Sequence, residues 1–265
     1  MLERMKRRSQ SGKPKSLSVR DRAYQYIQRA IADGVLEAGS GVSELSLAKE
    51  LGSSRTPIRE AMNQLAAEGL LRPGANGGMV VAQIQRDDIV ELYELREALE
   101  VYSVGKVAKI PLRPADKDRL QFMIDEIGRL REELAKSGAR ELDREQMKRF
   151  LGCDLGFHAL LVSLTGNTRI QKMINETRLL IRIFAIQRSG HDASQLESIQ
   201  KYHQRILDCV DSQDAPGAMQ ALAEHIQVSQ RERINDFDHW NREMAMRENM
   251  PGIFDLQRMA LGDIS

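Results

Sequence analysis

Two arginines at the start of a predicted helix constrain this chain more than any other feature. Residues 51–65 read LGSSRTPIREAMNQL, in which Ile58 and the apolar residues three, four and seven positions later form one helical stripe. Pro57 suits the first helical position, so we expect a helix that begins near Thr56, with Thr56 as its cap and Pro57 as its first residue. Arg55 and Arg59 lie off the apolar stripe, which places both guanidinium groups on one face near the helix N-terminus.

That placement is unfavourable for the isolated chain. A helix N-terminus carries partial positive charge, which disfavours a nearby cation by about 0.3–1 kcal/mol. An external anion would compensate, and two forked donors at a helix N-terminus suit phosphates and guanine edges in a DNA major groove. The alternative is a solvated arginine pair. Pairing of Arg55 and Arg59 with acidic residues of the chain itself would remove this electrostatic argument for DNA binding.

The segments around this helix predict a winged helix-turn-helix. Ser43 can cap a preceding helix, and Gly52 can end it in the left-handed conformation of a tight turn. Ser18 can cap a longer first helix. Two short strands, 70–72 and 79–81, are expected on either side of the turn-rich segment 73–78. Three helices followed by a β-hairpin are typical of winged DNA-binding domains.

Charge divides the chain into two parts. Residues 1–86 hold 14 Lys and Arg against 8 Asp and Glu, net +6, whereas residues 87–265 hold 25 against 30, net −5. A basic front half favours nucleic-acid binding at one end only. The expected divisions are a disordered basic tail at 1–17, a DNA-binding domain at 18–84, an all-helical effector-binding domain at 87–240 and a tail of unknown role at 241–265.

Nothing in the sequence predicts a membrane segment or a disulfide framework. The most apolar run, residues 179–186, is short and interrupted by Arg182, and the N-terminal tail lacks an apolar segment. Cys153 and Cys209 are too few for a disulfide scaffold and read as small buried residues. We therefore expect a cytoplasmic protein.

The second part of the chain has a helical pattern throughout. Turn signals interrupt it at 111–114, 137–138, 165–167, 189–190 and 214–217, and no strand-like alternation appears. This pattern predicts six or seven helices in an antiparallel bundle.

Four polar residues occupy positions on the apolar faces of three of these helices. They are Asp154, His158, His203 and His225. A carboxylate and three imidazoles form a set of metal ligands, for which Zn²⁺ is the first expectation and Ni²⁺ or another transition metal the alternative. The alternative to a metal site is that each histidine is a hydrogen-bonded core residue. His191 and His239 are expected to face solvent.

Arg96 is a further polar residue on an inward face, with Glu100 one turn later. It either forms an internal pair with Glu100 or offers a bidentate fork to the carboxylate of a ligand beside the metal. Arg178 and Arg182, also four residues apart, are weaker candidates because such pairs commonly line a solvated face.

The front half resembles the N-terminal domain of GntR-type bacterial transcription regulators. The similarity lies in residues 51–61, with Glu68-Gly69-Leu70-Leu71 and Gly77-Gly78. The resemblance implies that Arg55, Thr56 and Arg59 contact an operator and that the wing glycines near Gly77 approach the minor groove. Some members carry a further DNA-contacting arginine in the second helix, where this chain has Leu45.

The rear half is similar to the FCD ligand-binding domain of the FadR subgroup of that family. The matching strings are residues 94–100, residues 154–158 followed by Gly166-Asn167, His203 with Ile206-Leu207, and His225. The resemblance implies that Asp154, His158, His203 and His225 hold a divalent metal, and that a small carboxylic acid is the effector.

These observations together predict a homodimeric, ligand-responsive transcription regulator that binds a roughly palindromic DNA operator and is not an enzyme. Two alternatives remain. A metal centre with open positions can also activate water, which a metal-dependent enzyme acting on a small carboxylic acid would use. A DNA-packaging protein without an effector would bind with weak sequence preference and hold no metal.

Overall fold

The computed structural model describes residues 17–32, 34–75, 77–186 and 190–249. The chain divides into two compact units, Met1–Ala82 and Gln83–Ser265. Nearly all of the expected basic tail and residues 250–265 lie outside the described residues. Within the described part, no helix is both long and apolar enough to span a membrane.

The first unit contains three helices, α1 (Val19–Ala32), α2 (Glu44–Glu50) and α3 (Arg55–Ala67). Two of the predicted caps are confirmed, because Ser18 Oγ accepts from the backbone N–H of Asp21 and Ser43 Oγ from that of Ser46. Gly52 has φ +60°, the left-handed conformation that the turn between α2 and α3 requires.

The start of α3 was predicted two residues too late. The helix begins at Arg55 with Ser54 as its cap residue, so Thr56 lies inside the first turn instead of capping it. The Ser54 side chain makes no capping hydrogen bond. The consequence is that Arg55 and Thr56 both belong to the helix N-terminus, while Ile58, Met62 and Leu65 are fully buried as expected.

A three-stranded antiparallel sheet completes the first unit. Its strands are β1 (Gly41–Val42), β2 (Leu71–Pro73) and β3 (Met79–Val81), in the order β1-β3-β2. The expected hairpin is β2 and β3, with Leu71 opposite Val81. The sequence did not predict β1, whose Gly41 pairs with Val80. At the tip, Gly77 and Gly78 have φ +77° and +85°.

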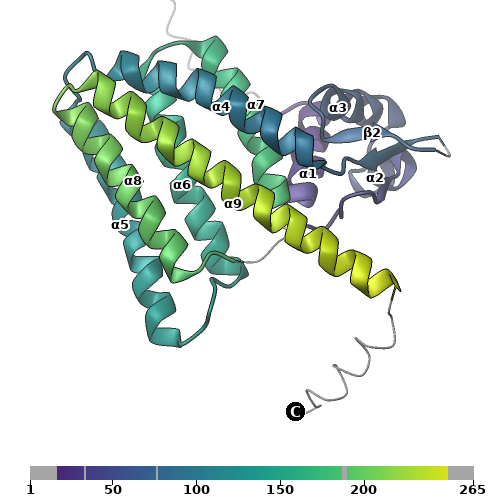
Figure 1. The fold of residues 1–265 in the computed structure, drawn as a ribbon. Helices are drawn as coiled ribbons and strands as arrows, with labels where there is room; N and C mark the ends of the chain where they lie inside the picture. Colours follow the sequence, from purple (N-terminus) through teal and green to yellow (C-terminus); the bar gives the residue numbers. More distant parts are fainter. Residues whose placement is uncertain (1–16, 33, 76, 187–189, 250–265) are drawn as a thin grey trace, which may run out of the picture. The chain divides into compact units, whose positions relative to one another are not determined.

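The described part of the second unit contains six helices and no strand beyond an isolated bridge between Glu141 and Asp192, in line with the predicted helical pattern. The helices are α4 (Arg86–Val107), α5 (Pro114–Ser137), α6 (Arg144–Leu164), α7 (Thr168–Ile186), α8 (Ala193–Asp211) and α9 (Ala215–Asn249). Helix α9 continues nine residues beyond the expected end at Trp240. Figure 1 shows α4 running alongside α9, and α5 alongside α8, as their many contacts require.

One large apolar cluster connects α4, α5, α6, α8 and α9. It includes Phe157 and Leu161 on α6, Ile206 on α8, and Leu222 and Ile226 on α9. The polar residues predicted to bind metal alternate with these apolar ones on the same inward faces, so packing of the core also sets the positions of the imidazoles.

Candidate metal centre and nucleic-acid interface

Three imidazoles from three helices converge in the middle of the bundle. The Nε2 atom of His158 lies 3.2 Å from Nε2 of His225 and 3.3 Å from Nε2 of His203, and the last two are 3.2 Å apart. Oδ1 of Asp154 lies 3.5 Å from Nε2 of His203 and 4.0 Å from Nε2 of His158. All four ligand atoms lie within 4.8 Å of one another, so the structure brings the four predicted ligands together.

The spacing of these nitrogens suits a bound transition metal. Nitrogens about 2.1 Å from an ion lie about 3.0 Å apart at a right angle and about 3.4 Å apart at the tetrahedral angle. The observed distances fall between these two values. The imidazoles are almost fully buried, and burial followed by charge repulsion from neighbouring groups holds the pKa of His203 and of His225 well below the usual range. Both rings are therefore neutral, which is the form that binds metals.

The outer nitrogens of two rings support the same conclusion. Nδ1 of His203 and Nδ1 of His225 are buried, and neither finds a hydrogen-bond partner among the described residues. If these Nδ1 atoms carry the protons, the Nε2 lone pairs point at one another. If the Nε2 atoms carry them, Nδ1 lone pairs are buried without a donor. A cation bound by the three Nε2 atoms removes the first conflict.

Glu100 on α4 contacts the ring of His158 at the nitrogen that does not face the other two imidazoles. Its Oε2 lies 2.8 Å from Nδ1 of His158, which leaves Nε2 of that ring directed at the cluster. Its Oε1 lies 3.0 Å from Nε of Arg96 and 2.9 Å from Arg178, so one buried carboxylate contacts two buried arginines. Burial opposes ionisation most strongly, but Arg178 and Arg96 together hold the pKa of Glu100 well below its usual value.

Arg96 thus forms the internal pair with Glu100 that the sequence allowed, and it also lines the cavity beside the histidines. Arg178 does not lie on a solvated face as expected. It is 4 % exposed and donates to the carbonyl of Leu155 as well as to Glu100. The side chain of Arg182 lies outside the described residues.

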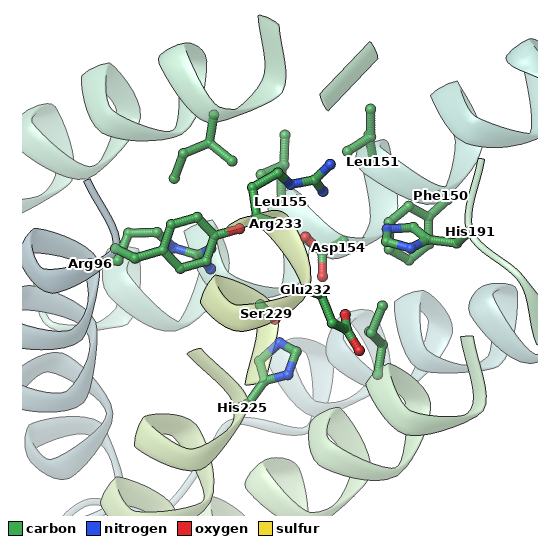
Figure 2. A pocket seen from close by; sticks show the side chains of 13 residues that line it. Arg96, Phe150, Leu151, Asp154, Leu155, His191, His225, Ser229, Glu232 and Arg233 are labelled. Carbon is green, nitrogen blue, oxygen red and sulfur yellow. The ribbon is translucent and has the colours of Figure 1, made fainter. Parts of the chain in front are cut away.

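A small cavity adjoins the metal ligands. Its volume is about 40 Å³, and its polar lining includes Arg96, Asp154, His225, Glu232 and Arg233. Figure 2 shows Asp154, His225, Glu232 and Arg233 around this space. Neither Glu232 nor Arg233 was singled out from the sequence, although both lie about two helical turns after His225 on α9.

His191 also lines this cavity, contrary to the prediction that it faces solvent. It is only 8 % exposed, and its ring packs edge-on against Phe150 with centroids 4.6 Å apart. The loop before α8 carries it inward, because the His191 carbonyl accepts from the backbone N–H of Leu142 and Nδ1 lies 3.2 Å from Gln195 Oε1. His239, by contrast, is 67 % exposed at its side chain.

The two arginines of α3 are paired with an acidic residue of α2. Oε1 of Glu44 accepts from Nε of Arg59 at 2.9 Å, and Oε2 accepts from Nη2 of Arg59 at 2.9 Å and from Nη2 of Arg55 at 3.2 Å. The argument that only an external anion compensates these charges is therefore wrong. Both arginine side chains nevertheless remain more than half exposed.

The other predicted DNA-contacting positions lie at the surface. Thr56 is exposed on the first turn of α3, and Gly77 is exposed at the tip of the hairpin. A Cβ atom at Gly77 would meet nothing within 4 Å, so the glycine serves its positive φ angle and not a close internal contact. Leu45 is 67 % exposed.

Comparison with protein families decides the identity of both units. The model for bacterial regulatory proteins of the gntR family matches residues 19–81, and the model for the FCD domain matches residues 91–228, more than half of the chain. The chain belongs to the GntR family of transcription regulators. Its two units correspond to the winged helix-turn-helix and the FCD domain of these regulators.

Relatives of this GntR regulator include two named repressors. A probable D-xylose utilization operon transcriptional repressor of Paenarthrobacter nicotinovorans is 29 % identical, covering 79 % of this chain and 86 % of the relative. The gluconate operon transcriptional repressor of Bacillus subtilis is 27 % identical over 62 % of each chain. The structure of E. coli McbR/YncC matches with a TM-score of 0.67 at 18 % identity, covering 84 % of this chain and all of that one, which supports the fold.

Proposed function

We propose that this GntR regulator is a homodimer whose two winged helices bind a palindromic operator and whose FCD domains sense a small carboxylate through a bound divalent metal. The observation that carries the sensing half is the convergence of His158, His203 and His225 with Asp154. Zn²⁺ suits this set of ligands best, and Ni²⁺ is the alternative. Such an ion would offer a small acid a Lewis-acidic site in the cytoplasm.

The DNA-binding half rests on family membership and on exposure. Arg55, Thr56 and Arg59 lie at the exposed N-terminal end of α3, the end that recognition helices commonly direct at base edges. In this proposal, phosphates or guanine edges compete with Glu44 for the two guanidinium groups, and Gly77 brings the wing backbone close to the DNA. Both relatives described above are named as repressors, so we propose that operator binding represses transcription.

A ligand can change operator affinity only by binding one arrangement of the dimer better than another. The cavity beside the metal ligands is lined from several helices, including α4, α6 and α9. A bound acid would therefore contact helices that can shift relative to one another, which gives it a route to such differential affinity.

The sensing half is tested by metal analysis of protein purified without chelator. We expect about one divalent ion per chain, and we expect His203→Ala to lose it. His239→Ala is the matched control, because that imidazole is exposed and pairs with Glu243, which is not one of the four proposed ligands. An unmodified protein that holds no metal, even after incubation with Zn²⁺, would refute the sensing half.

The DNA-binding half is tested by gel retardation on the promoter fragment of the regulator's own gene. Arg59→Ala should abolish retention and leave the helical circular dichroism unchanged. Arg22→Ala, which removes an exposed charge from α1, should retain most of the binding. Unchanged retention by Arg59→Ala would refute the proposed role of α3.

One observation keeps the metal-enzyme alternative in view. Glu232 lines the cavity beside the metal ligands, and burial, reinforced by the charge of Asp236, raises the pKa of its carboxyl. A carboxyl so placed could act as a general acid or base. Turnover of a small carboxylic acid by the metal-loaded protein would favour this alternative. That turnover should be lost in Glu232→Gln.

A further inference from the structure

The size of the cavity beside the metal ligands limits what it can hold. Its volume is about 40 Å³, whereas one water requires roughly 10–15 Å³ of such space. The cavity therefore has room for about three or four waters, and a dicarboxylate that reaches from the metal ligands into it requires the helices to move apart. Part of its wall is apolar and offers no hydrogen bonds. Those side chains are Leu151, Leu155, Ile181 and Ile199.

Arg96 lines this cavity, but it is also tied to the buried carboxylate of Glu100. Its Nε donates to Oε1 of Glu100, and the charge of that carboxylate raises the pKa of Arg96 against the effect of burial. Since Glu100 also contacts Arg178 and His158, withdrawing Arg96 would disturb a buried network of charges.

Arg233 differs from Arg96 at its Nε atom, because the Nε of Arg96 donates to Glu100 whereas that of Arg233 has no acceptor among the described residues. Its side chain is 12 % exposed, and its Nε is buried with no hydrogen-bond partner among the described residues. The ion pair between Nη1 of Arg233 and Oδ2 of Asp236 is long, at 3.5 Å. A buried guanidinium N–H without an acceptor is costly, so an acidic ligand would be bound strongly there.

The electrostatics of the cavity permit a second acidic group near Arg233. Burial lowers the pKa of His191 in the cavity wall, and the positive charge of Arg233 lowers it further. The charge of Arg233 therefore acts on groups within the cavity. Burial raises the pKa of Glu232, so its carboxyl group repels a bound carboxylate less than a fully ionised carboxyl group would. In the view of Figure 2, Asp154 lies between the His225 ring and the Arg233 guanidinium.

We propose that Arg233 on α9 binds a second acidic group of the effector, so that the cavity selects a short dicarboxylate whose other carboxylate binds the metal. This assignment rests on the proposed metal site. The apolar part of the wall favours methylene groups over hydroxyls between the two acidic ends, which disfavours polyhydroxy acids. Arg233 is then a specificity-determining residue, and Arg96 is part of the scaffold behind the metal ligands.

The experiment compares matched acids on zinc-loaded protein by calorimetric titration. Malonate and succinate are the dicarboxylate probes, and propionate and butyrate are the monocarboxylates of equal chain length. We expect each dicarboxylate to bind at least about tenfold more tightly than its partner. In Arg233→Gln this preference should disappear while zinc content and monocarboxylate affinity stay unchanged. Arg231→Gln, an exposed position on the same helix, should behave as the unmodified protein.

The outcomes separate this inference from the proposed function. Failure to bind zinc would overturn both. Zinc-dependent binding of monocarboxylates without a preference for dicarboxylates would overturn the role of Arg233 alone. A preference that persists in Arg233→Gln would also overturn it, because it would mean that the metal chelates both carboxylates. If Arg233→Gln does not fold, Asp236→Asn decides: severalfold tighter dicarboxylate binding supports the inference, and unchanged affinity overturns it.

Discussion

Glu44 sets the electrostatic state of the surface proposed to meet DNA. Because it accepts hydrogen bonds from both Arg55 and Arg59, its pKa is lowered, chiefly by Arg59, and part of the positive charge of α3 is neutralised. We expect Glu44→Gln to strengthen binding to random DNA about two- to fivefold, the range of a typical exposed ion pair. Operator binding should rise less, so the ratio of operator to random-DNA affinity should fall. Fluorescence anisotropy at fixed salt measures both affinities.

The control for that measurement is Glu50→Gln, which removes one negative charge from the same helix without contacting either arginine. Glu50 instead accepts from the Tyr26 hydroxyl on α1. A purely general charge effect would make the two variants equal, and that result would contradict the role assigned to Glu44.

Single side chains also show where sequence reasoning stops. The positions of the four proposed metal ligands followed from helical periodicity, because each breaks an apolar stripe. The ion-pair partners of the arginines could not be predicted from periodicity. Glu44 and Arg59 are 15 residues apart in the sequence, and Glu100 and Arg178 are 78 residues apart. Which carboxylate meets which arginine depends on how the helices pack, and periodicity does not encode that. His191 was missed for the same reason, because a loop carries it inward.

Helix α4 contacts the cluster of proposed metal ligands through one carboxylate, that of Glu100. Glu100→Gln would leave Arg96 and Arg178 buried without their shared negative partner. We expect a loss of about 3–5 kcal/mol in the free energy of unfolding of the metal-free protein. Denaturant titration followed by circular dichroism measures this loss.

The same substitution should weaken metal binding about 10- to 100-fold, because His158 loses the carboxylate that orients its Nδ1. Glu94→Gln is the matched control on an exposed position of α4 and should change stability by no more than about 0.5 kcal/mol. Equal metal affinity in Glu100→Gln and Glu94→Gln would show that Glu100 does not orient the ligand.

Elements were predicted well where their periodicity was long. The six helices of the second unit have 19 to 35 residues each, and their turn signals fall between them. Strand β1 has two residues, too few for any alternation to register, and it exists because β3 offers it a partner. The start of α3 was misplaced because the Arg55 backbone is already helical, a distinction that cap preferences do not resolve.

In the whole molecule, the proposed metal ligands belong to one of two compact units, so removing a metal bound by them should destabilise only that unit. The ligands come from α6, α8 and α9, all within Gln83–Ser265. A metal present at about 100 times its dissociation constant stabilises the state that binds it by about 2.7 kcal/mol. After chelation, we expect faster amide hydrogen exchange in α6, α8 and α9 and unchanged exchange in α1, α2 and α3.

Hydrogen exchange read by mass spectrometry resolves these segments in the intact chain. His203→Ala provides the reference, because a protein without the metal site should not respond to chelator at all. Equal acceleration in α1 to α3 would contradict the assignment of the metal to the second unit alone. If the change is confined to α6, α8 and α9, the metal does not alter the stability of the winged helix itself. Any influence of the metal on DNA binding must then act through the arrangement of the two units.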